Sequence, residues 1–339
     1  MSERSALVSG ATGYIGSWLV PELISEGWSV RALGRRPRPP WMTPEVDYRQ
    51  VDLVADDLGP LSRGITHVFH LAGASSSLSS IDEMHLANVV ATERLVTSLL
   101  GGGVQRLVYF SSTSVYGEDE QLPVPVREDM DPRPSRSYGK AKWDAEQAVW
   151  TGGESGLEVV VLRPVSVYGP GNVKLLGSAV LDAAIERFAG ESRLFVPSRS
   201  VEQRLVHIDD VVQAALHLAH FDDAAGRAFN VVFPEYPTNH DLVEILGREL
   251  AMSPELSDDA ECGLSYEDRS ATRSAMVSAG MQPDILLTTE RFRFMRKANR
   301  NNRLSVDALL STGFRFQDRD LAGPISRAVA WYGHNRWIL

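Results

Sequence analysis

Short apolar runs alternate with segments of helical periodicity along the first half of the chain. Apolar or β-branched residues fill 6–9, 29–33, 67–71, 106–112 and 159–163. Between several of these runs, apolar positions recur every three or four residues, in 15–25, 84–100 and 138–149. Strands that alternate with helices form βαβ units with parallel strands and right-handed crossovers. The pattern predicts a doubly wound parallel sheet, although Pro21 falls inside the first helical segment, where it should bend the helix.

The second half of the chain is less regular and predicts a smaller α/β region. Strand patterns occur at 205–208 and 229–232, and helical patterns occur at 209–219 and 241–250. The segment 253–260 is polar and acidic, which is typical of a loop. Because we find neither a repeat nor a long linker, we expect the second half to pack against the first.

Composition and charge are those of an ordinary globular chain. The 339 residues are 43% hydrophobic, and 44 acidic residues against 34 basic ones give a net charge of −10. That balance disfavours general binding to nucleic acid or to an anionic membrane surface. Cys262 is the single cysteine, which excludes an intrachain disulfide and a cysteine-based zinc site, and we predict no metal. With no signal-peptide pattern at its start and no apolar run of membrane-spanning length, the sequence predicts a cytoplasmic protein.

A glycine-rich turn follows the first predicted strand and opens the first predicted helix. It reads Gly10-Ala-Thr-Gly13-Tyr-Ile-Gly16. Glycines let the backbone turn sharply and approach a pyrophosphate, while the helix N-terminus supplies free N–H groups and the positive end of a dipole. The alternative is a plain tight turn, but the position between strand and helix favours a dinucleotide-binding site.

The second predicted strand ends without an acidic residue. An acid there usually binds the ribose 2′-hydroxyl of NAD, whereas arginine can pair with the 2′-phosphate of NADP. Here the strand is followed by Arg35 and Arg36, which favours NADP(H) and leaves NAD(H) possible. Alternatively, Arg35, Arg36 and Arg38 form a solvated basic loop together with three prolines.

Tyr138 and Lys142 are four residues apart and therefore share one face of a predicted helix. A nearby ammonium favours the tyrosine phenolate, so such a pair can move a proton to or from a substrate hydroxyl while a cofactor exchanges hydride. Upstream, the strand at 106–112 runs into a loop rich in Ser and Thr, at the sheet edge where ligands bind in such folds. The alternatives are an ordinary surface pair and ordinary turn chemistry.

Together these features resemble the extended short-chain dehydrogenase/reductase family, also called the epimerase/dehydratase family, in its nucleotide-sugar-modifying type. The resemblance covers residues 5–250 and depends on motifs that occur in the family's order. They are the glycine turn 10–16, Asp52-Leu53, His70-Leu-Ala-Gly73, Asn88, Ser111-Ser112, Val115-Tyr-Gly117, Tyr138 with Lys142, Arg163-Pro-Val-Ser-Val-Tyr-Gly-Pro-Gly171, and Arg204-Leu-Val-His-Ile-Asp-Asp210.

The resemblance implies roles for individual residues. Ser112 would hold the substrate oxygen, Tyr138 would pass the proton, and Lys142 would hold the nicotinamide ribose and tune Tyr138. Besides Arg35, Arg36, Tyr138 and Lys142, the cofactor would be bound by Gly10, Thr12, Gly13, Tyr14, Ile15, Gly16, Asp52, Leu53, Leu71, Ala72, Gly73, Asn88, Ser111, Pro164 and Val165. The substrate would be bound by Thr113, Ser166, Arg204, Arg293 and Arg296.

The resemblance also implies an architecture and an assembly. An NAD(P)-binding Rossmann domain would comprise 1–168 and 201–235, and a smaller C-terminal α/β substrate domain would comprise 169–200 and 236–339. Family members commonly form homodimers through a helix bundle, which here would include the helix that carries Tyr138 and Lys142.

Two departures from the family pattern narrow the expected reaction. Thr113 and Ser114 stand where 4,6-dehydratases carry an acidic pair, which argues against dehydration. Ser166 stands where nucleotide-sugar members usually have Asn, which weakens the case for that substrate class. We expect an NAD(P)-dependent ketoreductase or dehydrogenase that acts on a sugar-like substrate, above all a nucleotide-sugar. The alternatives are an epimerase that retains NAD, a 3β-hydroxysteroid-dehydrogenase-like enzyme, and a dinucleotide sensor without catalytic activity.

Overall fold

The chain divides into two compact units in the computed structural model, which describes residues 4–74, 80–117, 122–174, 176–258, 263–281, 303–317 and 320–338. Unit 1 comprises Met1–Val165, Ile208–Val232 and Asn302–Arg315. Unit 2 comprises Ser166–His207, Phe233–Asn301 and Phe316–Leu339.

The short segment 302–315 groups with unit 1, whereas the division predicted from the sequence has it in the C-terminal domain. Its main chain explains this grouping. Ser305 donates its backbone N–H to the carbonyl of Val126 at 2.9 Å, and the Ser305 carbonyl accepts from the Asn230 side chain at 3.1 Å. These partners lie far apart in the sequence, so no local sequence pattern predicts their contact.

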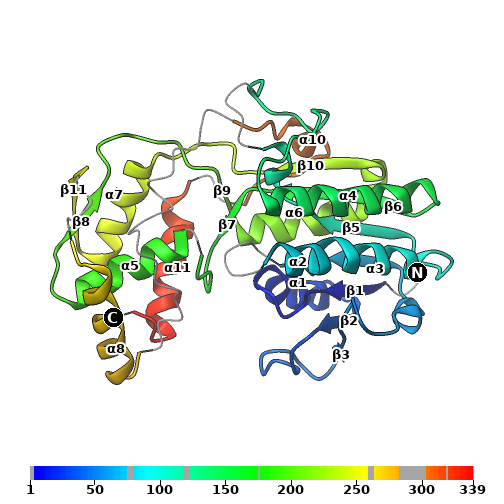
Figure 1. Cartoon of the computed structure of the whole chain (residues 1–339), viewed down its shortest axis with the longest axis horizontal. Coiled ribbons are helices and arrows are strands. Elements are labelled where there is room, and N and C mark those ends of the chain that lie inside the picture. The colour runs from blue at the N-terminus through cyan, green and yellow to red at the C-terminus, as the bar shows by residue number, and fades with distance from the viewer. Residues whose placement is uncertain are drawn as a thin grey trace. The chain divides into compact units, whose positions relative to one another are not determined.

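Unit 1 is built on a seven-stranded sheet with the strand order β10-β6-β5-β4-β1-β2-β3 (Figure 1). All six pairings are parallel. The predicted Rossmann-type, doubly wound parallel sheet is therefore confirmed. The strands are β1 (Ser5–Ser9), β2 (Ser29–Gly34), β3 (Asp47–Gln50), β4 (His67–His70), β5 (Arg106–Phe110), β6 (Glu158–Pro164) and β10 (Arg227–Val231).

Helices pack against both faces of this sheet. Leu7, Leu107 and Tyr109 belong to the core that the sheet shares with α3 (Ala91–Leu99) and α4 (Ser137–Glu154). Successive strand residues point to opposite faces. Residues next to these three therefore point to the other face, where α1 (Tyr14–Ser25) and α6 (Ile208–His220) pack against each other. Helix α1 continues through Pro21, which is exposed.

The segment predicted as one helix over 84–100 consists of three parts. They are α2 (Ile81–His85), a π-helical turn labelled η2 (Leu86–Val90), and α3. A π-helical turn inserts one residue into the helical register and often marks a functional site. The remaining short helices of unit 1 are η1 (Gly59–Ser62), η3 (Thr113–Tyr116), η4 (Asp222–Ala224) and α10 (Asp307–Ser311).

Unit 2 contains two small parallel sheets. In one, β7 (Ser166–Tyr168) pairs with β9 (Leu205–His207), and in the other, β8 (Arg193–Val196) pairs with β11 (Ser253–Leu256). The loop predicted over 253–260 is therefore wrong at its start, where 253–256 form β11. All four residues of β11 are exposed, so no apolar pattern marks the strand. The helices are α5 (Leu176–Phe188), α7 (Asn239–Leu250), α8 (Tyr266–Ser278) and α11 (Ala322–His334). Within the described ranges of the chain, no helix is long and apolar enough to cross a bilayer.

A buried ion pair fastens α4 to the sheet. Arg163 of β6 donates to the Glu146 carboxylate from Nε at 3.1 Å and from Nη2 at 2.7 Å, and both side chains are almost wholly buried. The Ser111 hydroxyl donates to the same carboxylate. Arg163 Nη1 also donates to the Tyr116 hydroxyl at 2.8 Å. Buried charges are tolerated only while every partner is in place, so this cluster fixes the position of α4.

We expect the variant Arg163→Met to lose about 3–5 kcal/mol of unfolding free energy, because the Glu146 carboxylate is then buried without its counter-ion. Chemical denaturation followed by circular dichroism measures the loss. The matched control is Arg49→Met, which removes an ion pair with Asp47 at the surface and should change stability by less than about 1 kcal/mol. Equal losses in the two variants would contradict the assignment.

Candidate active site

The glycine turn has no room for a side chain at Gly10 or Gly16. Gly10 has a φ of +70°, and a Cβ added there would lie 2.6 Å from the backbone nitrogen of Ala72. Helix α1 starts directly after Gly13, which makes no side-chain cap, and its first turn contains no acidic residue. The first N–H groups of a helix have no partners within the helix, and they form the positive end of its dipole. In α1 these groups adjoin the glycine turn, whose backbone a ligand can approach. This donor set fits the phosphates of a dinucleotide.

The end of β2 is closely packed and followed by two exposed arginines. A Cβ added at Gly34 would lie 2.6 Å from the Tyr48 hydroxyl and 2.9 Å from the Thr12 methyl group. The side chains of Arg35 and Arg36 are exposed and bond to none of the residues that the structure describes. Their carbonyls are held from β3, where Tyr48 donates to Arg36 O and Gln50 donates to Arg35 O at 3.1 Å.

Arg38 differs from its two neighbours. Its guanidinium donates to the carbonyls of Thr43 and Val46, at 2.8 Å in the second case. Arg38 therefore holds the loop together, while the guanidinium groups of Arg35 and Arg36 are presented to solvent. Arg38 is exposed like its two neighbours and differs from them only in these bonds to the main chain of the loop.

Ser112 and Tyr138 come together where the loop after β5 meets the start of α4. Ser112 caps η3 by accepting from the backbone N–H of Ser114 at 3.2 Å. A Cβ at Gly139 would overlap the Ser114 carbonyl oxygen, so α4 begins directly against this loop. Burial raises the pKa of the Tyr138 phenol, and a hydrogen bond with the Ser112 side chain opposes that rise.

Lys142 lies one helical turn beyond Tyr138 and is 5% exposed. Its Nζ donates to the carbonyl of Phe110 at 2.8 Å, which places the amine at the end of β5. Burial lowers the pKa of Lys142 to about 8, against the opposing charge of Glu146. An ammonium that titrates near neutrality, one turn from a tyrosine, can change the acidity of that tyrosine.

Asn88 in η2 supplies a buried acceptor beside Lys142. Its Nδ2 donates to the carbonyls of Met84 at 2.9 Å and Ala74 at 3.1 Å. Its Oδ1 is buried and has no hydrogen-bond partner among the described residues. A Cβ added at Gly73 would overlap this oxygen and would lie 3.6 Å from Lys142 Nζ. A buried orphan acceptor next to an amine fits a hydroxyl-bearing ligand such as a dinucleotide ribose.

The remaining predicted cofactor residues of unit 1 have different surroundings. The Ser111 hydroxyl is bonded to Glu146, so any cofactor contact would come from other atoms of Ser111. Asp52 accepts from the backbone of Val54 at 2.8 Å, and Leu53 is buried. The other predicted cofactor residues lie at strand ends or in the glycine turn. Their contact with a cofactor stays a prediction. They are Tyr14, Ile15, Gly16, Leu71, Ala72, Pro164 and Val165.

The predicted substrate residues are distributed over both units. Thr113 begins η3 in unit 1 and is half-buried. Ser166 and Arg204 belong to unit 2, where Ser166 pairs in register with Leu205, the residue after Arg204. Arg293 and Arg296 lie outside the described residues.

Two residues that the sequence analysis missed stand beside Lys142. Glu146 follows Lys142 by four residues, so extending the helical spacing of Tyr138 and Lys142 by one more turn would have found it. Tyr109 gives no such signal, because it lies inside an apolar strand run. Only the packing of α4 on β5 brings Tyr109 to the amine.

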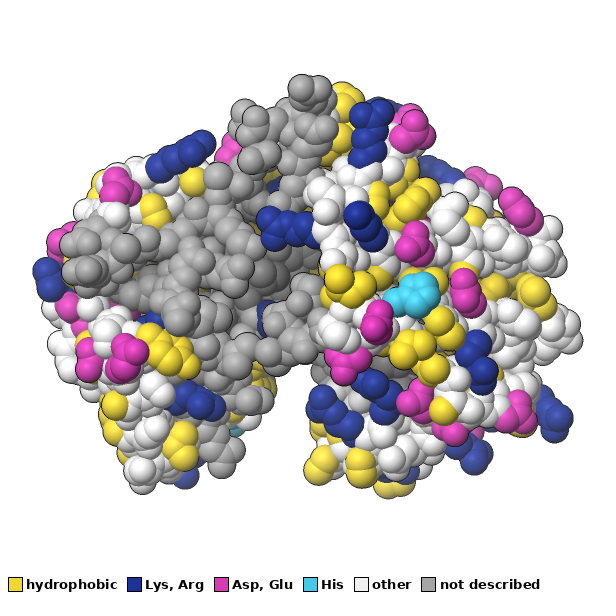
Figure 2. Space-filling model, viewed as in Figure 1, with side chains coloured by type: hydrophobic (Ala, Val, Ile, Leu, Met, Phe, Trp, Pro, Cys, Tyr) yellow, Lys and Arg dark blue, Asp and Glu magenta, His cyan; other side chains and the backbone are white. Residues whose placement is uncertain are grey.

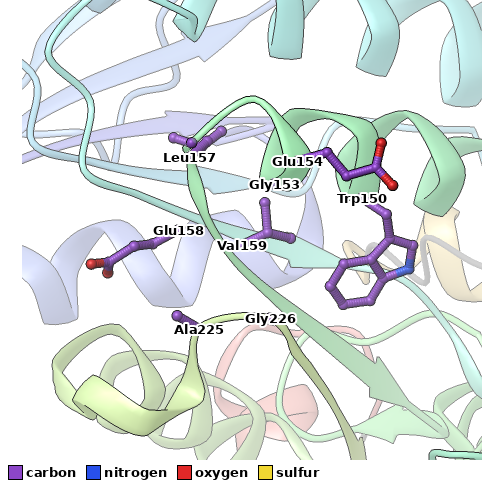
Figure 3. Close-up of a pocket in the computed structure, with 9 residues that line it drawn as sticks. Trp150, Gly153, Glu154, Leu157, Glu158, Val159, Ala225 and Gly226 are labelled. Carbon is purple, nitrogen blue, oxygen red and sulfur yellow. The ribbon is translucent and has the colours of Figure 1, made fainter.

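A surface hollow at the far end of α4 lies apart from these residues (Figure 3). Its lining comes from the last two turns of α4, the start of β6 and the loop before β10, including Trp150, Glu158 and Gly226. Trp150 is three turns beyond Tyr138, and Glu158 begins β6 whereas Ser112 follows the end of β5. The hollow therefore lies at the amino ends of the parallel strands, whereas Ser112 and Tyr138 lie at their carboxyl ends. In the described part of the chain, no group of three or more His, Cys, Asp or Glu could hold a metal ion.

We expect Gly73→Ala to weaken dinucleotide binding by about tenfold, because the added methyl group must displace the Asn88 side chain beside Lys142. A fluorescence titration with NADPH and NADH measures the affinity. Gly153→Ala is the matched control, since its Cβ would make only ordinary contacts, the shortest of them 3.5 Å to Val159. Unchanged affinity in a folded Gly73→Ala variant would show that this crowded position lies outside the cofactor site.

Comparisons with known proteins agree with this arrangement. Residues 6–231 match the model of the NAD dependent epimerase/dehydratase family. The dTDP-6-deoxy-L-talose 4-dehydrogenase (NAD(P)(+)) of Kitasatospora kifunensis is 34% identical over 266 residues, which cover 74% of this chain and 80% of that protein. The solved structure of MoeE5 in complex with UDP-glucuronic acid and NAD superposes with a TM-score of 0.73 at 25% identity, over 97% of this chain and 99% of that one.

Other relatives match over a shorter stretch. The 2-alkyl-3-oxoalkanoate reductase of Stenotrophomonas maltophilia is 32% identical over 182 residues, which cover 50% of this chain and 53% of that protein. The chain likewise spans between 50% and 60% of several other curated relatives. The named relatives are dehydrogenases and reductases, which supports an enzyme. Since the family model covers well over half of the chain and its motifs stand on the elements described above, the chain belongs to the NAD dependent epimerase/dehydratase family.

Proposed function

We propose that this chain is an NADP(H)-dependent ketoreductase or dehydrogenase that acts at a hydroxyl or keto carbon of a nucleotide-sugar. The observation that carries the proposal is Tyr138, hydrogen-bonded to Ser112 and one turn from the buried amine of Lys142. The relative from Kitasatospora kifunensis supports the substrate class, because its name describes a dehydrogenase of a dTDP-sugar that uses NAD(P)+.

The residues of this chain divide the proton chemistry among them. Ser112 orients the substrate oxygen, and Tyr138 donates a proton to that oxygen in reduction or removes it in oxidation. Burial raises the pKa of Tyr138. The Lys142 ammonium, one turn further along α4, would stabilise the phenolate and oppose that rise. The nicotinamide, when bound, supplies or accepts the hydride. Since the pKa of Lys142 is about 8, this support is present below that pH and is lost as the pH rises through it.

The residues at the end of β2 support NADP(H) as the cofactor. It lacks an acidic side chain, and Gly34 is packed so closely against Tyr48 and Thr12 that a side chain there would displace them. Arg35 and Arg36 follow Gly34 directly in the chain, and both are exposed. Guanidinium groups bind a phosphate through paired, charge-assisted hydrogen bonds.

We further propose that the protein forms a homodimer through α2, η2 and α4. We also propose that it is cytoplasmic. Ile81 of α2 and Leu86 of η2 are 70% and 46% exposed. Figure 2 shows hydrophobic side chains among charged ones of both signs on the face of unit 1 that carries these helices. The composition, with a single cysteine, supports a reducing compartment.

Replacing Tyr138 with Phe should reduce turnover by about 10²- to 10⁴-fold, because the proton-transferring hydroxyl is removed. The measurement is NADPH consumption with a panel of keto-sugar nucleotides, and NADP+ reduction with the corresponding hydroxyl forms. Dinucleotide affinity should not change, which a titration of the same sample checks. The control is Tyr266→Phe, at an exposed tyrosine of α8. Surviving turnover in Tyr138→Phe would overturn the catalytic assignment.

The double change Arg35→Ala and Arg36→Ala should weaken NADPH binding by about tenfold or more and leave NADH binding unchanged, because charge-assisted bonds to the 2′-phosphate are lost. Titration of the purified protein with both dinucleotides tests this, with Arg49→Ala as an exposed arginine control. The purified protein is first denatured so that any bound dinucleotide is released and identified. Tightly retained NAD would contradict the NADP(H) preference and favour an epimerase.

A further inference from the structure

The Lys142 amine is held from the sheet side by one aromatic residue. Besides the bond to the Phe110 carbonyl, Nζ lies 3.4 Å from the Tyr109 hydroxyl and 5.0 Å from the centroid of the Tyr109 ring. An ammonium within about 6 Å of a ring face is stabilised by the negative potential of that face. Tyr109 therefore offers the amine both a ring face and an oxygen acceptor.

Tyr109 itself is locked in place. It stands in the middle of β5, and its side chain is wholly buried. Its hydroxyl is hydrogen-bonded to Thr92, whose own hydroxyl accepts from His70 Nε2 at 2.8 Å. The His70 ring lies 5.5 Å from the Tyr109 ring. Burial raises the pKa of Tyr109 and lowers that of His70 to about 3, so both side chains are neutral at working pH.

Few charged groups that the structure describes near Lys142 can stabilise its ammonium, so the contact with Tyr109 matters for the protonation of the amine. The charge of Glu146 on α4 and the His70 ring on β4 interact electrostatically with the amine, and Tyr109 on β5 contacts it. Tyr138 precedes Lys142 by one turn of α4. Glu146 is the only anion of this set, and its carboxylate already binds Arg163 and Ser111. A buried amine with so little free counter-charge depends on neutral groups to remain protonated.

We propose that Tyr109 is a positioning residue, whose ring face and hydroxyl keep the Lys142 amine protonated and directed toward Gly73 and Asn88. The inference deepens the proposed function, because the ammonium held in this way is the one that makes Tyr138 a usable acid and base. Among the described residues, Tyr109 has no hydrogen bond to Ser112 or Tyr138, and its direct contact at the candidate site is with the Lys142 amine.

The test is a direct titration of Lys142 in the full chain without added dinucleotide. The chain has only four lysines, so NMR of protein labelled at the lysine ε-carbons resolves few signals, and Lys142→Met assigns the relevant one. Tyr109→Leu removes the ring and the hydroxyl, and Tyr109→Phe removes the hydroxyl alone. The matched control is Phe69→Leu, a wholly buried aromatic residue of β4 that pairs in register with Val108 and so faces the other side of the sheet.

We expect the Lys142 midpoint, at about 8 in the parent chain, to fall by about one pH unit in Tyr109→Leu. Tyr109→Phe should lower it by about 0.3 units, since only the long 3.4 Å contact is lost. Phe69→Leu should leave it unchanged. A midpoint that stays in place in both Tyr109 variants overturns the proposal, and so does an equal fall in the control. If Tyr109→Leu does not fold, Tyr109→Phe decides by the direction of its shift.

A second measurement separates this inference from the proposed function. In the direction of hydroxyl oxidation, the pH at which turnover is lost should move down together with the Lys142 midpoint in Tyr109→Leu, and it should not move in Phe69→Leu. Failure of every substrate and dinucleotide with the parent chain would refute the proposed function, while the NMR titration would still decide the role of Tyr109. Normal turnover with an unmoved pH profile in Tyr109→Leu would refute only the role of Tyr109.

Discussion

The buried carboxylate of Glu146 is the constraint on which the candidate site depends. It lies one turn beyond Lys142 and two turns beyond Tyr138, on the same face of α4. Because it binds Arg163 of β6 and the Ser111 hydroxyl at the end of β5, it fixes α4 to two neighbouring strands. The positions of the tyrosine and the amine relative to the sheet edge follow from that attachment. Removing either charge would leave the other buried without a partner, so the arrangement is stable only as a whole.

A second buried network orders the cofactor side of the sheet. The Ala72 N–H donates to the Ser9 hydroxyl at 3.3 Å, Ser9 meets His70 Nδ1 at 2.5 Å, and His70 Nε2 meets the Thr92 hydroxyl. Thr92 gives its one proton to the Asn88 carbonyl, so His70 must donate from Nε2 and accept at Nδ1. Only a neutral imidazole can do this, and burial keeps it neutral. The glycine-turn strand, the loop after β4 and the π-helical turn are thereby joined.

These two networks divide the work at the site. The charged one holds the helix that carries the proton-transferring groups. The neutral one holds the loop of Gly73 and the turn of Asn88. The buried Asn88 Oδ1, beside the Lys142 amine, has no hydrogen-bond partner among the residues that the structure describes. Tyr109 belongs to both, because it bonds to Thr92 and also contacts Lys142. A change on one side is therefore expected to reach the other through this residue.

The order of strands and helices in unit 1 could be predicted from the sequence, because alternating apolar runs and helical periodicity are local properties and parallel βαβ units have a fixed hand. The glycine turn and the spacing of Tyr138 and Lys142 were visible for the same reason. The exposed strand β11 and the return of Ser305 to Val126 were not, since main-chain pairing leaves no side-chain pattern.

The sequence by itself thus determined which groups are present and on which elements they lie. Only the tertiary structure decided which of them meet. Tyr109 and Lys142 are 33 residues apart and touch because α4 packs on β5. Arg36 and Arg38, two residues apart, are both exposed, but only the Arg38 guanidinium is bonded to loop carbonyls within the described part of the chain. Packing of the elements decides which residues distant in the chain become hydrogen-bond partners, and a local sequence pattern does not predict that packing.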